Sequence, residues 1–132
     1  MQTTAAHVQG SFEALEAAQS AHARLARLVR MIGAGVEASD MAGLRALTEE
    51  GGLSRDEADA LVAIEASPAP KCEAWTAFFI DAVTDHAVWQ SRPTGVVNEE
   101  QGEWLIAMAD RCASRAALGA LANIAAEAHR LP

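Results

Sequence analysis

The sequence contains no tyrosine, and only 5% of its residues are aromatic. Few of its β-branched residues occur in runs. Strands favour aromatic and β-branched side chains, so this shortage argues against a β-sheet. Much of the 51% hydrophobic content is alanine, which is the strongest helix former. The composition therefore predicts an all-α fold.

The chain has only two cysteines, Cys72 and Cys112, and they do not form a paired motif. Isolated cysteines are typical of small buried side chains, although a disulfide between the two is the alternative. No stretch reaches the roughly 20 apolar residues that span a bilayer. The N-terminus also lacks the basic and apolar regions of a signal peptide. We therefore expect a cytoplasmic protein without a membrane span.

Basic residues are outnumbered, with ten Lys and Arg against eighteen Asp and Glu, and the formal net charge is −8. Proteins that bind nucleic acids need a basic surface to neutralise phosphates, so this balance argues against a nucleic-acid partner. The motifs GxSxG, HExxH, GxxxxGK[ST] and GxGxxG are absent as well. We therefore expect no enzymatic activity and no cofactor other than a divalent cation.

The 132 residues are most simply one domain, which is long enough to bury a core without disulfides or metals. Capping residues, glycines and prolines divide the chain into about six predicted helices, and the residues before Ser11 are expected to be loose. The helices are expected at roughly 11–32, 39–49, 54–66, 73–89, 98–111 and from 114 onward. On this basis 1–38 would be an N-terminal helix with its linker, and 39–132 the main helical domain.

One pattern of residues occurs twice, in segments 53–64 and 97–108. Each copy follows a glycine turn and begins with a capping residue, Ser54 or Asn98, before a carboxylate-rich helix start. Ser54 and Glu57 fit the S-x-x-E capping box. The pattern indicates two internally similar helix–glycine turn–helix units, packed against each other as an orthogonal bundle.

The two units would span 39–66 and 73–111, on either side of a proline-containing hinge. Segment 73–89 carries the broadest apolar face, so it should be the central core helix. That face consists of Trp75, Phe78, Phe79, Ala82, Val83 and His86. We expect His86 to be a core histidine with one ring nitrogen hydrogen-bonded. The last helix has a narrower apolar stripe that includes Leu118 and Leu121.

Asp81 and Asp85 lie one helical turn apart, and such a like-charge pair is unfavourable on an exposed helix. A nearby cation would relieve the repulsion. That cation would be a divalent metal ion or the guanidinium of Arg92 or Arg111. The glycine turns themselves are not expected to bind calcium, because the leading ligand positions of an EF-hand loop hold no carboxylates there.

The first predicted helix is unlike the others because Arg24, Arg27 and Arg30 give it a positive flank. We expect this flank to be a solvated face or to pair with the domain's own carboxylates. The apolar residues of this helix are then available either for its own domain or for a second chain. A subunit contact is the sharper alternative, and a tryptophan from the end of segment 73–89 could add to it. The expected contact residues are Leu25, Leu28, Ile32 and Trp89.

Three segments, 53–61, 75–85 and 97–106, resemble the TerB-like tellurite-resistance family and related bacterial helical proteins. The resemblance covers roughly residues 44–110 and leaves the first predicted helix unmatched. It implies an all-helical domain of paired units that binds a metal through acidic residues and acts in stress-response complexes. The residues that would hold the metal are Asp81, Asp85, Glu99 and Glu100.

These observations favour a helical interaction module that lacks enzymatic activity. We expect it to bind itself, as a homodimer, or another protein through the first helix. The alternative is a divalent-metal-binding helical domain in a stress-response complex.

Overall fold

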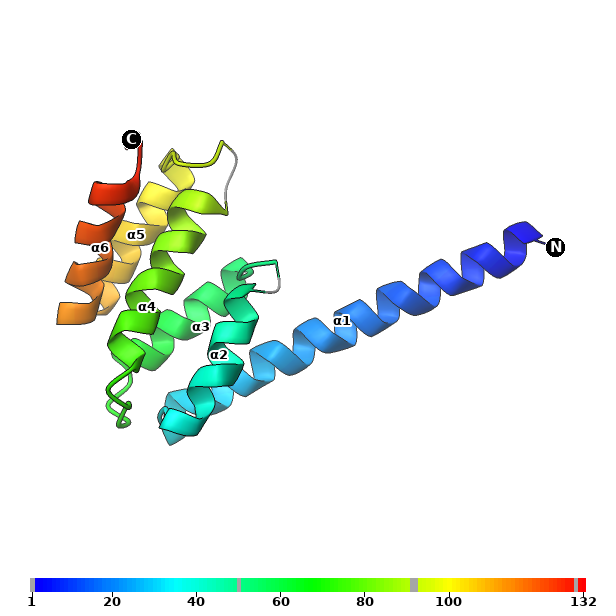
Figure 1. Cartoon of the computed structure of the whole chain (residues 1–132), viewed down its shortest axis with the longest axis horizontal. Coiled ribbons are helices and arrows are strands. Elements are labelled where there is room, and N and C mark those ends of the chain that lie inside the picture. The colour runs from blue at the N-terminus through cyan, green and yellow to red at the C-terminus, as the bar shows by residue number, and fades with distance from the viewer. Residues whose placement is uncertain (1, 50, 91–92, 130) are drawn as a thin grey trace.

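The described residues of the computed structural model form six α-helices (Figure 1). The structure describes residues 2–49, 51–90, 93–129 and 131–132, and all of their side chains except those of 2–11, 17 and 18. The helices are α1 (Gln2–Ala34), α2 (Met41–Glu49), α3 (Arg55–Ala66), α4 (Trp75–Thr84), α5 (Glu99–Arg111) and α6 (Arg115–Glu127). A short 3₁₀ helix, η1 (Ala38–Asp40), precedes α2, and a π-helical turn, η2 (Asp85–Trp89), extends α4.

The predicted all-α fold is confirmed. Within the described ranges no strand occurs, and β-type pairing there is limited to isolated bridges, such as the one between Val36 and Lys71. No helix of this described part combines the length and the apolar character needed to cross a bilayer. The internal likeness of the two predicted units and their orthogonal packing stay predictions.

Local capping signals place three helix starts where the sequence predicts them. The Ser54 hydroxyl accepts the Glu57 N–H at 3.1 Å, and the Glu57 carboxylate accepts the Ser54 N–H at 2.9 Å. At α5 and α6 only the first of these two bonds is formed: the side chains of Asn98 and Ser114 each accept the N–H of the residue three positions later. These bonds satisfy backbone donors that a helix start leaves open.

The start of α2 differs from the prediction, since Ser39 does not cap it. The chain first makes the 3₁₀ turn η1, in which the Glu37 N–H donates to Asp40 Oδ2 at 2.8 Å. Helix α2 then begins at Met41. The capping position therefore lies at Glu37, before η1, and the Asp40 side chain accepts its N–H.

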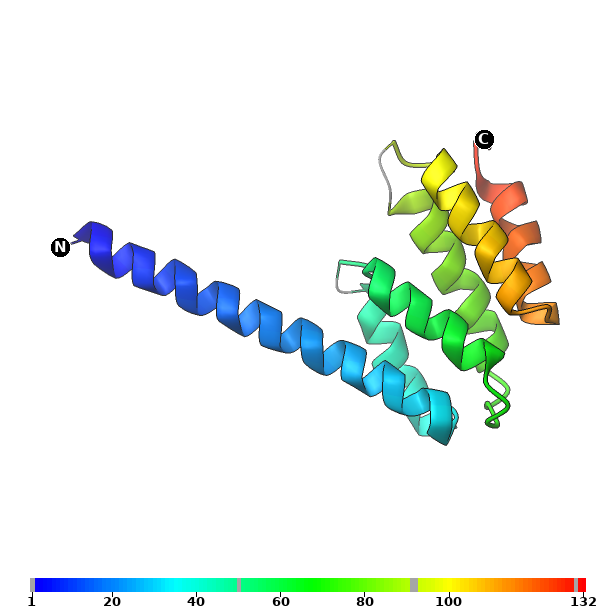
Figure 2. The same cartoon turned by 180° about the vertical axis from the view of Figure 1, so that it is seen from behind.

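The core is built around α4, as predicted. Trp75, Phe79 and Val83 are almost completely buried, and α6 lies along α4 (Figure 1). Helix α3 lies along the inner part of α1, which we define as residues 24–34 (Figure 2). Leu28 in this inner part is fully buried in the same core. The inner part of α1 therefore belongs to the domain.

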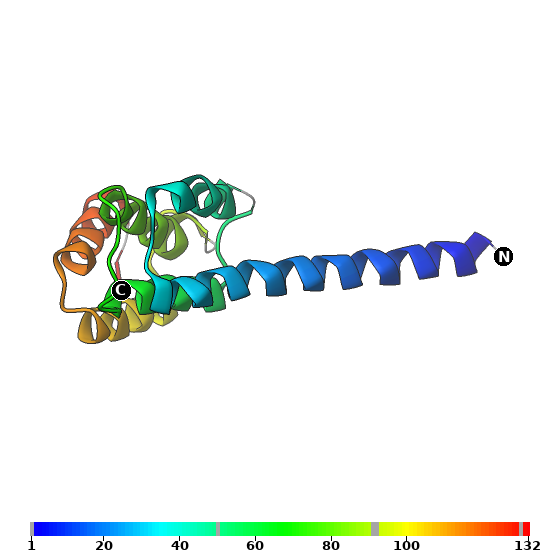
Figure 3. The ribbon, with the colours of Figure 1, turned by 90° about the horizontal axis from the view of Figure 1, so that it is seen from below.

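Helix α1 begins much earlier than predicted. Residues expected to be loose are helical from Gln2, and the helix continues through Gly10 and Ser11 without a break. A single glycine costs a helix only about 1 kcal/mol relative to alanine, and the alanine-rich flanks offset this. The result is one helix of 33 residues, about 50 Å long. Its outer part, residues 2–23, projects away from the other helices (Figures 1 and 3).

Helix α1 ends at a close approach between two chain segments. Gly35 has a φ of +87°, and a Cβ atom at this position would collide with the Pro70 carbonyl oxygen. The same oxygen accepts the Val36 N–H at 3.0 Å, and the Val36 carbonyl accepts the Cys72 N–H at 2.9 Å. Only glycine meets both the conformational and the steric demand here. This contact joins the end of α1 to the hinge before α4.

Two further details differ from the sequence-based expectation. The predicted helix 73–89 changes to π geometry at η2, where the Gln90 N–H donates to the Asp85 carbonyl at 2.9 Å. In α6, Leu118 is 65% exposed rather than buried. The buried face of α6 consists instead of Ala116, Ala117, Ala120 and Ile124. These small side chains let α6 pack closely on α4.

Candidate functional site

The outer part of α1 exposes large apolar side chains. Phe12 and Leu15 are 58% and 57% exposed, and Val29 is 52% exposed farther along the same helix. Three views show the ribbon around residues 12–15 clear of all the other helices (Figures 1, 2 and 3). We call the exposed stripe the outer face of α1; it consists of Phe12, Leu15, Gln19, His22, Ala26 and Val29. Contiguous exposed apolar surface is typical of interaction sites, so the outer face of α1 is a candidate site.

The opposite face of α1 is used inside the domain. Leu28 is fully buried, Met31 is nearly so, and Leu25 and Ile32 are half-buried against the core. Three of the four residues expected in a subunit contact therefore pack against their own chain. The apolar residues of α1 therefore form two separate stripes. One packs against the domain, and the other is exposed on the opposite side of the helix.

An ion pair holds the inner part of α1 in place. Arg24 Nε lies 2.9 Å from Glu57 Oε2, and both side chains are largely buried. Arg24 Nη2 also donates to the carbonyl oxygens of Leu47 and Gly52, at 3.1 and 3.3 Å. Glu57 thus caps α3 and neutralises Arg24 at the same time. The sequence indicated the capping box and raised pairing of the arginine flank with the domain's own carboxylates, but it did not identify Glu57 as the partner.

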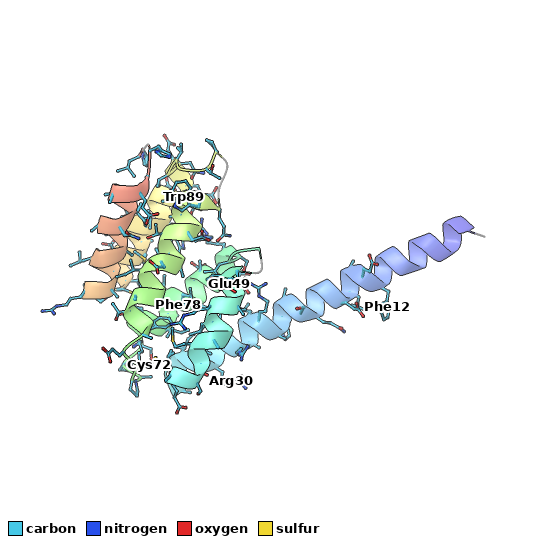
Figure 4. All side chains as sticks on the ribbon, viewed as in Figure 1. Phe12, Arg30, Glu49, Cys72, Phe78 and Trp89 are labelled. Atoms are coloured by element: carbon cyan, nitrogen blue, oxygen red, sulfur yellow. The ribbon has the colours of Figure 1, made fainter. Side chains whose placement is uncertain are left out.

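The other two arginines of the positive flank are exposed. The guanidinium of Arg27 lies over Gly43 of α2, close enough to touch a Cβ atom there. Arg30 lies near the base of the helix (Figure 4). Of the three arginines on the positive flank of α1, only Arg24 forms an ion pair within the described residues.

A groove of about 550 Å³ opens between α2, α4 and the end of α6. Glu49, Phe78 and Trp89 lie along one side of the molecule in this region (Figure 4). Four carboxylates line the groove against a single guanidinium, that of Arg45. The lining carboxylates are Glu49, Asp81, Asp85 and Glu127.

The structure brings Asp81 and Asp85 to this groove, but Glu99 and Glu100 do not line it. Burial raises the pKa of Asp85, the neighbouring His86 lowers it, and the charge of Glu127 raises it again. Arg92, one of the predicted partners, lies outside the described residues. In the part of the chain that is described, no three His, Cys, Asp or Glu side chains converge as a metal site would require.

Trp89, the fourth expected contact residue, lies at the groove and far from the outer part of α1 (Figure 4). Its indole N–H donates to Glu127 Oε1 at 3.1 Å, and its ring meets that of His129 edge-on at 5.8 Å. Trp89 therefore ties η2 to the C-terminal end of α6.

His86 is buried as predicted, but neither ring nitrogen makes a hydrogen bond of ordinary geometry. Burial is the main cause of its lowered pKa, and the positive charge of Arg55 adds to the effect. The ring meets Trp104 edge-on at 5.2 Å, and Trp104 donates its indole N–H to Asp59 at 2.7 Å. The Arg55 guanidinium covers the other side of Trp104 at 5.0 Å. This cluster joins η2, α3 and α5, and burial keeps His86 neutral.

The two cysteines are free thiols, so the disulfide alternative is wrong. Cys112 is buried and its thiol donates to the Val62 carbonyl at 3.3 Å, whereas Cys72 is half-buried. Burial raises the pKa of the Cys112 thiol, which keeps it protonated and unreactive.

Comparison with known proteins adds no identification. No family model matches the chain, and neither a curated protein nor a solved structure is similar to it. The resemblance to the TerB-like family therefore stays a prediction.

Proposed function

We propose that the chain is a non-enzymatic helical interaction module that self-associates through α1. The observation that carries this proposal is the exposure of Phe12 and Leu15 on a helix that projects from its domain. Burying a side chain of this size contributes about 1.5–3 kcal/mol, so two of them on each copy supply a substantial driving force. The proposal includes a cytoplasmic location.

Light scattering and sedimentation velocity of the full chain over a range of concentrations test the proposal. We expect a species of twice the 13.9 kDa chain mass that dissociates on dilution. The double variant Phe12→Ser, Leu15→Ser should weaken association at least about a hundredfold, because each lost apolar contact is worth more than a tenfold change.

A matched control replaces two apolar residues that are equally exposed elsewhere. Ile106 on α5 and Leu118 on α6 are 66% and 65% exposed. The variant Ile106→Ser, Leu118→Ser should associate like the unchanged chain. A chain that stays monomeric at high concentration would overturn the proposal, and so would equal loss of association in both variants.

The groove supports a second candidate function, the binding of a divalent cation. Its four carboxylates face one guanidinium, so like charges repel one another there; the pKa of Asp85 is raised mainly by burial and to a lesser extent by the charge of Glu127. A bound cation would relieve this repulsion. Asp81 and Asp85 are the two predicted metal residues that share the groove.

Thermal melting with added calcium, magnesium, manganese or zinc tests the second candidate. A cation at a hundred times its dissociation constant stabilises the folded protein by about 2.7 kcal/mol. We expect Asp81→Asn, Asp85→Asn to abolish the stabilisation. Glu99→Gln, Glu100→Gln is the matched control because neither residue lines the groove. If none of the four metals raises the melting temperature, the candidate is wrong.

A further inference from the structure

The outer face of α1 follows a seven-residue repeat. Phe12, Gln19 and Ala26 are spaced by seven residues, and so are Leu15, His22 and Val29. The two series alternate in steps of three and four, which is the spacing of the a and d positions in a coiled coil. All six side chains are exposed.

Apart from His22, which borders an open cavity of about 570 Å³ shared with Ser54 and Asp56, this repeat faces away from the domain. Leu28 is buried, whereas Val29, the next residue, is exposed, because successive residues point about 100° apart around a helix. Arg24 and Met31 share the buried side with Leu28, and Phe12 and Ala26 lie on the opposite side. A second helix can therefore lie along the outer face without displacing α3.

Side-chain size along the repeat is unequal. The bulky residues Phe12 and Leu15 lie in the outer part, and the smaller Ala26 and Val29 in the inner part. A parallel pair would place phenylalanine against phenylalanine and alanine against alanine, leaving one layer crowded and another empty. An antiparallel pair places large against small in every apolar layer, which gives the even density of a packed core.

The charged residues of α1 are also distributed unequally between its outer and inner parts. Glu13 and Glu16 lie in the outer part, and Arg27 and Arg30 in the inner part. A parallel pair would bring like charges together, whereas an antiparallel pair sets each acidic segment beside a basic one. Of these four residues, Glu16 and Arg30 fall at the flanking e positions when Phe12 is taken as a, and opposite charges at such positions select orientation and partner.

We infer that two copies of this chain pair antiparallel along the outer faces of α1, with Phe12 opposite Val29 and Leu15 opposite Ala26 of the second copy. Gln19 then faces His22 of the second copy twice, at the centre of the contact. These two central layers are polar, and polar residues at core positions fix the register of a coiled coil. The two domains lie at opposite ends of the paired helices. This inference rests on the proposed self-association and adds its partner, direction and register.

Disulfide trapping between two variants of the full chain tests the inference. Both carry Cys72→Ser, because Cys72 is half-buried, while the buried Cys112 is kept. One adds Leu15→Cys and the other Ala26→Cys. In the antiparallel pair these cysteines face each other, whereas the two copies of position 15 lie about 16 Å apart along the axis, beyond the roughly 7 Å that a disulfide spans. We expect the mixture to cross-link about tenfold faster than Leu15→Cys alone.

A second pair, Phe12→Cys with Val29→Cys, should trap in the same way and guards against local effects at position 15. Ala26→Cys mixed with Ile106→Cys is the control, since Ile106 is exposed on α5, and it should not cross-link. Faster trapping of Leu15→Cys alone would show a parallel pair and overturn the inference. Dimers that trap in neither pair would overturn it too. A monomeric unsubstituted chain would instead overturn the proposed self-association.

Discussion

Arg24 is the residue on which the docking of α1 depends most. Its guanidinium meets the Glu57 carboxylate at 2.9 Å in a largely buried site. The variant Arg24→Met keeps the packing of the side-chain stem but leaves the carboxylate buried without its counter-charge. Breaking a buried pair from one side costs about 3 kcal/mol or more. We therefore expect a clear loss of stability in urea-induced unfolding.

The double variant Arg24→Met, Glu57→Gln separates the charge from the contact. Glutamine preserves the capping box with Ser54 and carries no charge, so part of the lost stability should return. Arg30→Met should unfold like the unchanged protein, because Arg30 is exposed. An Arg24→Met variant of unchanged stability would contradict this account of the ion pair.

His86 should make the fold sensitive to mild acid. Burial lowers its pKa below the usual 6.5, so the unfolded chain takes up a proton at a pH where the folded chain resists it. Stability contributed by the neutral ring is complete above pH 6.5 and is lost as the pH falls toward the folded-state pKa. Urea unfolding from pH 7.5 to 5.5 should show this loss, and His86→Leu should reduce it.

The quantity to compare is the slope of the unfolding free energy with pH, because leucine also changes the packing on Trp104 and so shifts the stability at every pH. His22→Gln, compared in the Phe12→Ser, Leu15→Ser background so that pairing of α1 does not contribute, is the matched control because that side chain is exposed on α1. The control should keep the slope of the unchanged protein. An unaltered slope in His86→Leu would exclude His86 as its source.

Burial of Asp85 should lower the stability of the fold at neutral pH, whereas burial of His86 lowers it in mild acid. Burial raises the pKa of this carboxyl, so its charged form is unfavourable in the folded state at neutral pH. Asp85→Asn should therefore raise the melting temperature at pH 7. The gain should vanish as the pH falls below the usual carboxyl value of 3.8, where Asp85 is protonated in both states. A lower melting temperature at pH 7 would contradict this reasoning.

At the scale of elements, the end of α1 provides a matched pair of glycines. Gly35 has a positive φ and no room for a Cβ atom beside the Pro70 carbonyl, whereas Gly33 is helical with open space around it. Gly35→Ala should destabilise the fold by about 1–3 kcal/mol, in line with the cost of a strained backbone site. Gly33→Ala should be neutral or stabilising by up to about 1 kcal/mol. Thermal melting of both variants tests this prediction. Equal changes in melting temperature for Gly35→Ala and Gly33→Ala would contradict it.

Helix starts that depend on neighbouring residues were predictable. Ser54, Asn98 and Ser114 cap their helices because the donor and the acceptor lie three residues apart in sequence. The α4 core face was predictable for a similar reason, since its apolar residues repeat with the helical period. The all-α class follows from the same local evidence.

What depends on distant contacts was not predictable. Glu57, the partner of Arg24, is 33 residues away in the sequence, and no local pattern identifies it as the partner. Leu118 fits an apolar stripe in sequence, yet α4 packs on the alanine face of α6 and leaves Leu118 in solvent. The division of α1 into a domain-facing and an outer face likewise depends on where α3 lies. Because of this, the sequence suggested self-association but assigned it to Leu25, Leu28 and Ile32, which pack within the chain.

The whole molecule should be markedly elongated even as a monomer. A compact chain of this length would have a radius of gyration of about 14 Å. The projecting part of α1 must raise this value (Figure 3). Small-angle X-ray scattering of the Phe12→Ser, Leu15→Ser variant at low concentration should therefore give a clearly larger radius. A value near 14 Å would mean that α1 folds back on its domain.

The projection of α1 also has a consequence for how the helix is held together. A helical segment of about 20 residues without tertiary contacts is marginal in water, whereas the turns next to Arg24 and Leu28 are locked by the domain. Amide hydrogens in the outer part should exchange quickly in a dilute sample, and those near Leu28 slowly. Pairing with a second copy would carry protection outward along the same helix. The exchange profile of α1 would then report, residue by residue, how much of the protein is associated.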